Sequence, residues 1–544
     1  MDEQKIRLLD SQFAHFMAMR SELSGQEKEQ FQNIVCRLSM GLAAGDSCLP
    51  VTDVEQDLIV RSGLSGVGAQ PFYVFDKHLY MQRYFEHEQS LAKSIQALLT
   101  NSTELIAEAS LFDDLFEKRD KAETDWQRVA AKRALQEKFL IVSGGPGTGK
   151  TTTVVKILAL VLSASSNPLR IALAAPTGKA ARRLQDSINN NVQTLMVSDS
   201  IKKSIPDTAS TIHRLLGVKR YSPFFKHNVK NPLLYDLVVI DEASMVDLSL
   251  MDKLVSALRP GSRLILLGDK DQLASVESGT VLADMIEHLP GNTVELQRSY
   301  RFDEGIKRFA AAINSGDSAA AWALMSADSP DNVSLLEGDV AEYGGEMYCR
   351  YMDAVRGAAS ISDYKKLFQV FHSFKILCAL RHGPAGVSGI NGAVEEYLMQ
   401  KGYDCFGADW YVGRPVIITR NEYTLDLYNG DMGISLPDPE NPSSMKVWFE
   451  RADGGLFGVF PGRIANCETV YALTIHKSQG TEIGEILVVL PEQESSLVTR
   501  ELLYTAVTRA RESVKVSSSR AVFECAVAGR IERHSGLGGR FAGN

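Results

Sequence analysis

A glycine-rich run from Gly144 to Thr151 holds the residue types that bind the phosphates of a nucleotide. Glycines let the backbone turn so that successive N–H groups point inward around an anion. Lys150 can reach the outer phosphates, and the hydroxyl of Thr151 is a suitable ligand for Mg²⁺. The run predicts a nucleoside triphosphate site made of Gly144, Gly145, Pro146, Gly147, Thr148, Gly149, Lys150, Thr151 and Thr152.

Such a loop needs a buried strand before it and a helix after it. The apolar run at residues 139–142 is typical of that strand, and residues 152–158 begin a helical pattern. The N terminus of the helix adds partial positive charge at the phosphates. A glycine-rich turn without a nucleotide would not require these two flanking elements.

A second apolar run, at residues 237–240, ends directly before Asp241 and Glu242. In an NTPase, Asp241 would hold Mg²⁺ through water and Glu242 would polarise the attacking water. The alternative, that the two acids merely cap the start of a helix, is the minor one and is weaker still beside a phosphate loop. Gln272 follows the next strand, where a side chain could report the γ-phosphate to another surface, although this element is a weak signal alone.

The composition is that of a globular chain. Its 544 residues are 44% apolar and 23% charged, and this length predicts roughly three or four domains. No apolar run reaches the length of a membrane span, and the seven cysteines form no C-x-x-C pair. We therefore expect a cytoplasmic protein without a membrane partner. The net charge of −9 leaves nucleic acid binding open, because gripping one strand needs only a local groove.

The strand and helix patterns divide the chain. From about residue 119 to 296, strands at 139–142, 170–174, 237–240 and 263–267 alternate with helical stretches, which predicts a parallel sheet covered on both faces. A second such pattern begins near residue 297, with strands at 375–379 and 485–490 and a helix from Glu501. The β-rich stretch from about 405 to 470 predicts a small inserted barrel, with an exposed loop at 437–442.

Residues 1 to about 118 carry no catalytic pattern, and we interpret them as a small docking domain. A second helix is expected to stop at Gly41 and Gly45, and residues 72–81 predict a short hairpin. The first helix is expected to place its apolar residues on one face: Ile6, Leu9, Phe13, Phe16 and Met17.

Further motifs occur in a fixed order around the phosphate loop and the acidic pair. They are residues 125–131 (DWQRVAA), 175–181 (APTGKAA), 210–217 (STIHRLLG), 267–276 (LGDKDQLASV), 296–302 (LQRSYRF), 377–387 (LCALRHGPAGV), 428–434 (YNGDMGI), 472–482 (ALTIHKSQGTE) and 503–511 (LYTAVTRAR). In this order the chain resembles the superfamily 1 helicases. Within them it resembles the RecD family, the 5′→3′ motor subunits of the bacterial RecBCD exonuclease V complex.

The resemblance implies a role for each matching residue. Gln127 is similar to the glutamine that reads the adenine edge, and Glu482 to the acid that contacts the ribose. Arg301 and Arg509 resemble the two arginines that approach the γ-phosphate from the second α/β domain. The implied catalytic residues are Lys150, Asp241, Glu242, Gln272, Arg301 and Arg509, with Thr151 and Asp241 at the metal. The residues implied along a single-strand DNA channel are Thr177, Lys179, Thr211, His213, Thr474 and His476.

For the whole chain the resemblance implies an α/β fold. Two RecA-like parallel-sheet domains (119–296, and 297–404 with 471–544) would accompany an α-rich N-terminal docking domain (1–118) and an SH3-like β-barrel insert (405–470). It implies an ATP-dependent 5′→3′ DNA helicase that uses ATP and Mg²⁺. Its partners would be RecB-like and RecC-like subunits, and it would act on duplex ends in double-strand break repair and homologous recombination. DNA cleavage would belong to a partner subunit. The stretch from 276 to 296 is short for the family.

Three alternatives remain open at this point. A standalone RecD-like helicase needs no complex, but such proteins usually carry a longer N-terminal region. A non-helicase NTPase, such as a nucleotide kinase, would have no use for residues 474–482 and Arg509. A catalytically silent scaffold is disfavoured because every expected catalytic residue is present.

Overall fold

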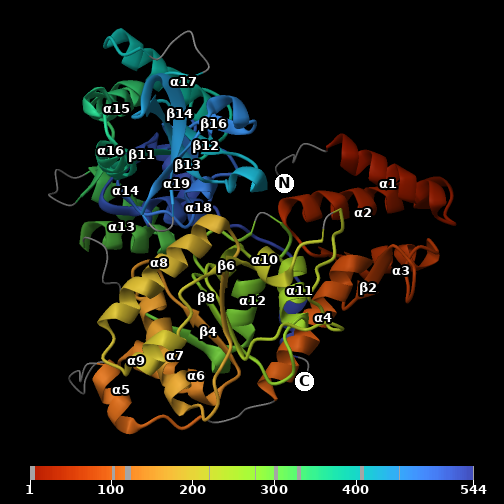
Figure 1. Ribbon diagram of the computed structural model, residues 1–544. Coiled ribbons are helices and arrows are strands. Elements are labelled where there is room, and N and C mark those ends of the chain that lie inside the picture. The colour runs from red at the N-terminus through yellow and green to blue at the C-terminus, as the bar shows by residue number, and fades with distance from the viewer. Residues whose placement is uncertain are drawn as a thin grey trace.

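The computed structural model describes residues 7–100, 105–116, 124–219, 221–275, 277–298, 304–326, 332–404, 410–451 and 454–542. Figure 1 shows an N-terminal domain in red and orange, a first α/β unit mainly in orange, yellow and light green, and a second α/β unit in green to blue that carries the insert. None of the helices within these ranges combines the length and apolar content that a membrane span needs.

Six parallel strands form the sheet of the first α/β unit, in the order β6-β5-β7-β8-β4-β9. The predicted apolar runs form its central strands, which are buried along their whole length. Helices α6, α7 and α8 pack on one face and α11 and α12 on the other. The elements are α6 (Trp126–Gln136), β4 (Phe139–Ser143), α7 (Lys150–Ala164), β5 (Ile171–Ala175), α8 (Gly178–Thr194), α9 (Asp199–Ser204), β6 (Ser210–Thr211), α10 (Ile212–Leu216), β7 (Leu237–Ile240), α11 (Leu248–Ser256), β8 (Arg263–Gly268), α12 (Val281–His288) and β9 (Thr293–Glu295).

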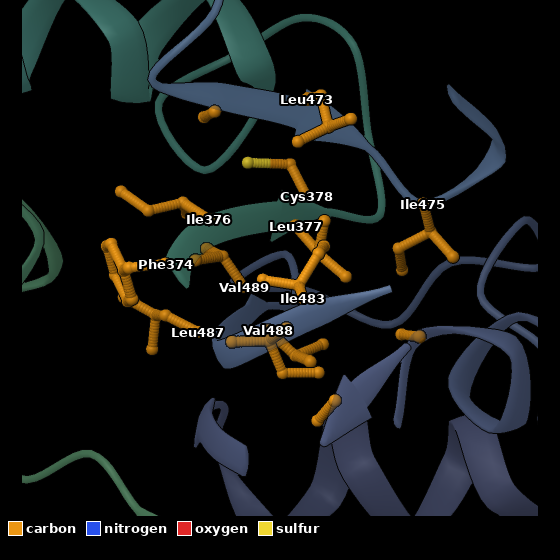
Figure 2. Packing of buried hydrophobic residues seen from close by; sticks show 14 of the residues in the cluster. Phe374, Ile376, Leu377, Cys378, Leu473, Ile475, Ile483, Leu487, Val488 and Val489 are labelled. Carbon is orange, nitrogen blue, oxygen red and sulfur yellow. The ribbon is translucent and has the colours of Figure 1, made fainter. Parts of the chain in front are cut away.

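The second α/β unit repeats this architecture with five parallel strands, in the order β10-β19-β18-β11-β17. Figure 2 shows how apolar side chains of β11, β17 and β18 fill its core. The two parallel sheets confirm the expected pair of α/β domains. The elements are α13 (Glu304–Ser315), α14 (Ser318–Ser326), β10 (Val333–Leu335), α15 (Val340–Gly357), α16 (Ile361–Ser373), β11 (Phe374–Cys378), α17 (Val387–Gln400), β17 (Ala472–Thr474), β18 (Ile483–Val489), α18 (Arg500–Val507), β19 (Ala510–Ser517) and α19 (Arg520–Ala528).

The insert is an antiparallel sheet in the order β15-β14-β13-β12-β16, which enters the second unit between β11 and β17. This confirms a β-rich insert. Strands β15 and β16 lie at opposite edges of the described ladder, so closure into an SH3-like barrel stays a prediction. The strands are β12 (Pro415–Ile418), β13 (Met432–Asp438), β14 (Asn441–Glu450), β15 (Leu456–Val459) and β16 (Cys467–Thr469).

The exposed loop expected at residues 437–442 is wrong. Strand β13 continues to Asp438 and β14 begins at Asn441, so only residues 439 and 440 form the turn. The pairing register shifts between Pro437 and Asp438. Such a bulge accommodates a proline, which has no N–H to donate to the ladder. A proline-rich stretch therefore forms a tight hairpin.

In the N-terminal domain, the predicted hairpin is confirmed. Asp76 and Lys77 join its strands with φ values of 47 and 58°, the pair of left-handed residues typical of a type I′ turn. Helix α2 passes Gly41 and ends at Gly45, whose φ of 101° suits a glycine cap. The elements are α1 (Leu8–Arg20), α2 (Gly25–Ala44), β1 (Leu49–Pro50), α3 (Asp53–Arg61), β2 (Phe72–Phe75), β3 (His78–Met81) and α4 (Gln82–Leu99), followed by α5 (Ala109–Leu115).

The apolar face expected for α1 is wrong in part. Leu9 and Phe16 are 68% and 50% exposed, and Ile6 lies outside the described residues. An ion pair of 2.7 Å joins the buried Asp10 to Arg7, and this hydrogen bond lowers the pKa of Asp10 to about 2. Phe13 and Met17 are partly buried and pack against the core of the N-terminal domain, as expected, beside small residues that let α1 approach its neighbours closely. The residues that it buries are Asp10, Ala14 and Ala18.

The end of the chain leaves the second unit after α19. Helix α20 (Leu537–Ala542) packs against α4 and α12, where Leu537 is buried in the core of the first unit. The resemblance places residues 471–544 in the second α/β domain, and the last part of this range packs on the first unit and the N-terminal domain. The other domain limits stay predictions.

Candidate functional site

The phosphate loop joins β4 to α7, and its lysine lies over the loop. Gly147 and Gly149 have φ values of 77 and 82°, a left-handed backbone that glycine adopts without strain. The ammonium of Lys150 donates to the carbonyl oxygens of Gly144 and Gly145, at 2.6 and 3.1 Å. Burial lowers the pKa of Lys150. The lysine is therefore held against the loop that would carry the phosphates.

Asp241 and Glu242 follow β7 at the carboxyl edge of the sheet, beside the phosphate loop. Burial and the neighbouring carboxylate of Glu242 raise the pKa of Asp241, whereas Lys150 opposes this shift. Glu242 has φ 51° and ψ 43°, a left-handed conformation that costs a non-glycine residue about 1–3 kcal/mol. Its backbone N–H donates to Oδ1 of Asp241 at 2.9 Å. The strained turn thus sets two carboxylates side by side.

A chain of hydrogen bonds links the two α/β units. Nη2 of Arg509, from the second unit, donates to Oε1 of Gln272, from the first, at 2.9 Å. Nε2 of Gln272 donates to Asp269 at 3.0 Å, and the hydroxyl of Tyr504 donates to the same carboxylate at 3.3 Å. Arg509 is 3% exposed, and burial lowers its pKa. An outward-facing Arg509 would have excluded a shared site, and the structure places it inward.

These residues border one cavity of about 410 Å³ between the two units. The first unit contributes the phosphate loop, the acidic pair, Gln272 and one face of α8, and the second contributes the rest. Of the predicted loop residues, Gly144, Gly145 and Thr148 are not among those that border it. The lining consists of Pro146, Gly147, Gly149, Lys150, Thr151, Thr152, Arg183, Asp186, Ser187, Asn190, Asn191, Asp241, Glu242, Gln272, Glu482, Arg509 and Arg511.

Sequence reasoning missed the polar face of α8. Arg183 forms an ion pair with Glu482 of the second unit and lies 3.8 Å from Glu242. The hydroxyl of Thr152 donates to Oδ1 of Asn191 at 3.0 Å. The polar residues recur every three or four positions, which indicates one face of a helix. This spacing does not show whether the face borders a cavity or the solvent. The face consists of Arg183, Asp186, Ser187, Asn190 and Asn191.

The other nucleotide contacts implied by the resemblance have different positions. Gln127 is not among the lining residues; its Nε2 donates to a carbonyl of the phosphate loop at 3.4 Å. Glu482 borders the cavity, and its carboxylate accepts from Arg183 and Arg511. Arg301 lies outside the described residues.

A groove of about 980 Å³ separates the first unit from the insert. Arg214 stacks its guanidinium over the ring of Tyr428 at 4.7 Å and donates to its hydroxyl. Thr177 caps α8 by accepting from the N–H of Ala180 at 3.2 Å, so the N terminus of α8 opens onto the groove. Three of the predicted DNA contacts therefore meet here. The lining consists of Pro176, Thr177, Gly178, Thr211, His213, Arg214, Val218, Asn421, Thr424, Tyr428 and Asn429.

The structure does not bring the other predicted DNA contacts into this groove. Lys179 lies in a separate hollow with Asp431 and Glu450 of the insert, and burial there lowers its pKa to about 8. Positions two residues apart on a helix differ by about 200° around its axis, so Lys179 and Thr177 lie on different sides of α8. Thr474 ends β17, and His476 is exposed in the turn that follows. The DNA roles of these residues stay predictions.

Three segments of the chain match models of known families. A model of the N-terminal domain of RecBCD enzyme subunit RecD matches residues 2–120, an AAA domain model matches 127–278, and a UvrD-like helicase C-terminal domain model matches 469–516. The RecBCD enzyme subunit RecD of Mycolicibacterium smegmatis is 39% identical over 499 residues, which cover 90% of this chain and 87% of that protein. The chain belongs to the RecD family.

Other relatives agree with membership of the RecD family. The RecBCD enzyme subunit RecD of Haemophilus influenzae is 34% identical and covers 85% of this chain and 79% of its own length. The ATP-dependent RecD2 DNA helicase of Deinococcus radiodurans is 31% identical over 84% of this chain and 57% of that protein. The resemblance inferred from the ordered motifs is therefore confirmed.

Proposed function

We propose that this RecD-family chain is an ATP-dependent 5′→3′ DNA helicase. It would be the motor subunit of a cytoplasmic RecBCD-type exonuclease V complex in double-strand break repair and homologous recombination. The observation that carries the proposal is α8: its N terminus opens onto the groove, and its polar face borders the cavity between the two units. A change in the width of the cavity therefore moves a wall of the groove through one rigid helix.

In the proposed cycle, ATP lies between Lys150 of the first unit and Arg509 of the second. Both cations face the cavity, so the triphosphate draws the units together. Arg509 stabilises the charge that develops during phosphoryl transfer, and Glu242 positions the attacking water. Loss of the γ-phosphate removes that attraction, and the cavity opens.

Thr151 and Asp241 are the residues that would hold Mg²⁺. Both border the cavity, and the raised pKa of the buried Asp241 carboxylate fits a cation site, since a bound cation favours the charged form. When bound, the ion neutralises phosphate charge and orients the triphosphate.

The groove suits one DNA strand without reading its sequence. Thr177 and Thr211 offer hydroxyls, and the first turn of α8 offers backbone N–H groups and partial positive charge, both of which suit phosphates. The ring of Tyr428 and the guanidinium of Arg214 offer flat surfaces for stacking. We retain Lys179, Thr474 and His476 as DNA contacts on the family resemblance alone.

Unwinding of tailed duplexes tests this function. We expect single-stranded DNA to stimulate ATP hydrolysis by the full chain, and duplexes with a 5′ tail to be unwound. Unwinding only of 3′-tailed duplexes would overturn the polarity. ATP hydrolysis that ignores single-stranded DNA would favour a non-helicase NTPase. Full unwinding without RecB-like and RecC-like subunits would favour the standalone helicase.

We assign the outer face of α1 to docking in the heterotrimer with RecB-like and RecC-like subunits. A cluster of exposed apolar side chains marks a protein interaction surface. The residues of this face lie on one side of the helix, with the exposed Gln12 and His15 between the two apolar pairs. It consists of Leu8, Leu9, Phe16 and Met19, which are 77%, 68%, 50% and 60% exposed.

The substitution Phe16→Asp should weaken co-purification with a RecC-like subunit at least about tenfold, because it buries a carboxylate in an apolar interface. ATP hydrolysis by the isolated chain should not change. Val60→Asp on α3 is the matched control, since Val60 is 57% exposed. Undiminished co-purification of the Phe16 variant would show that α1 is not the docking face.

A further inference from the structure

The C-terminal segment, residues 529–542, connects three parts of the molecule. At its start, the carbonyl of Gly529 accepts from the N–H of Arg500 at 2.9 Å, and the N–H of Ile531 donates to Glu501 at 3.2 Å. Both partners belong to α18 of the second unit. In Figure 1 the C label lies beside α4, away from the other blue elements. The segment therefore runs from the second unit to the N-terminal domain.

The far end of this segment is fastened by Glu88 of α4. Its carboxylate is fully buried and accepts from the hydroxyl of Ser47 at 2.6 Å, the N–H of Gly536 at 3.1 Å and Nε of Arg540 at 3.1 Å. Removing one partner of such a buried pair is strongly destabilising, because it leaves the other charge uncompensated. The end of the chain is thus a fixed point.

Between these two attachments, Arg533 donates hydrogen bonds to three backbone carbonyls. Its Nη1 donates to the oxygens of Ser275, Glu277 and Gly279, at 2.8, 3.3 and 3.4 Å. Gly45 of the N-terminal domain lies against the guanidinium, since a Cβ there would come within 2.4 Å of Cζ. The carbonyl of Gly45 also accepts from the N–H of Gly279 at 2.9 Å. The N-terminal domain and the C-terminal segment therefore hold one short loop of the first unit.

That loop directly follows the residues that join the two α/β units. The N–H of Leu273 donates to the hydroxyl of Thr505 at 2.9 Å. Its neighbour Gln272 accepts the hydrogen bond from Arg509. Only two residues lie between Gln272 and Ser275, whose carbonyl Arg533 holds. A displacement of this carbonyl therefore reaches Gln272 through a short, hydrogen-bonded backbone.

We propose that Arg533 is a positioning residue for ATP hydrolysis, which holds Gln272 at hydrogen-bonding distance from Arg509 by fixing the loop behind it. Arg533 is not among the residues that border the nucleotide cavity, so it acts through Gln272. All three hydrogen bonds from Arg533 to this loop come from Nη1, so a single nitrogen of Arg533 holds the loop. The inference rests on the roles proposed above for Gln272 and Arg509.

The test compares Arg533→Ala, Arg533→Lys, Gln272→Ala and the Arg533→Ala/Gln272→Ala double variant in the full chain, by ATP hydrolysis with single-stranded DNA. We expect Arg533→Ala to lower kcat about tenfold with KM for ATP within about twofold, the signature of a contact that matters in the transition state. The lysine variant should recover part of the loss. In the double variant, Arg533→Ala should add nothing to the effect of Gln272→Ala. Arg520→Ala is the control, because Arg520 pairs on the surface with Glu524, one turn away, and lies over the ring of Trp322, away from the cavity lining.

The outcomes separate this inference from the proposed function. Unchanged turnover in Gln272→Ala would overturn the proposed role of Gln272, and this inference with it. A slow Gln272→Ala combined with a normal Arg533→Ala, or full additivity in the double variant, would overturn this inference alone. Loss of ATP binding in both Arg533 variants would show a purely structural role and overturn it as well.

Discussion

Replacing Lys150 with glutamine will lower ATP turnover by at least about 10²–10³-fold, the loss expected when one preorganised donor to a reacting oxygen is removed. Glutamine is shorter than lysine and has no charge, so it can neither reach the γ-phosphate nor neutralise its charge. The charge also matters locally, because Lys150 faces the carboxylates of Asp241, Glu242 and Asp269. Steady-state hydrolysis with saturating single-stranded DNA measures the effect.

Lys156→Gln is the matched control for that variant. Lys156 lies on the same helix, and its ammonium sits 4.7 Å from the ring centroid of Phe116, away from the cavity lining. We expect normal turnover in this control and intact co-purification with partner subunits in both variants. Loss of partner binding in Lys150→Gln would contradict the separation of docking from hydrolysis. Full activity of a complex that contains it would favour a catalytically silent scaffold.

Replacing Arg509 with alanine will slow hydrolysis by about 10³-fold or more, as for other arginines that meet the transferring phosphoryl group. ATP should still bind, because the phosphate loop belongs to the first unit. The variant also loses the hydrogen bond to Gln272 and the bond from its Nε to the carbonyl of Thr505. We therefore expect weaker mechanical coupling between the two units in addition to slower ATP hydrolysis.

A second substitution and a control make the Arg509 result interpretable. Arg509→Lys keeps the charge but not the fork, and it should recover only a small part of the rate. Arg356→Ala also removes an arginine of the second unit that donates to a carbonyl, that of Gly402 at 2.7 Å, and it should hydrolyse ATP normally. Unchanged turnover in Arg509→Ala would reject the proposed role. A raised KM with normal kcat would assign Arg509 to ATP binding alone.

Segments with strong local signals were predictable from the chain. The strands before the phosphate loop and before Asp241 are continuous apolar runs, which a doubly covered parallel sheet requires. The hairpin at residues 72–81 was predictable because Asp76 and Lys77 interrupt two short apolar runs. In each case the residue types that favour the local structure are also the types that its position in the fold requires.

Predictions failed where a contact distant in sequence decided the outcome. Helix α1 buries Asp10, whose carboxylate accepts a hydrogen bond from the hydroxyl of Ser39 on α2 at 2.7 Å, so Leu8, Leu9 and Phe16 lie on the exposed side of the helix. Residues 437–442 form a hairpin because β13 and β14 each gain a neighbouring strand, and a bulge at Pro437 accommodates the proline. Propensity along the chain does not contain these pairings.

The order of its motifs was enough to place this chain in its family and to name most of the residues that border the cavity between the two units, because the phosphate loop and the acidic pair are each continuous in sequence. The face of α8 that borders the cavity, and the reach of Arg533 to the loop behind Gln272, emerge only on folding. Both depend on residues hundreds of positions apart meeting at one point. The helical spacing of polar residues shows that a helix has a polar face. Only tertiary packing decides which part of the protein that face contacts.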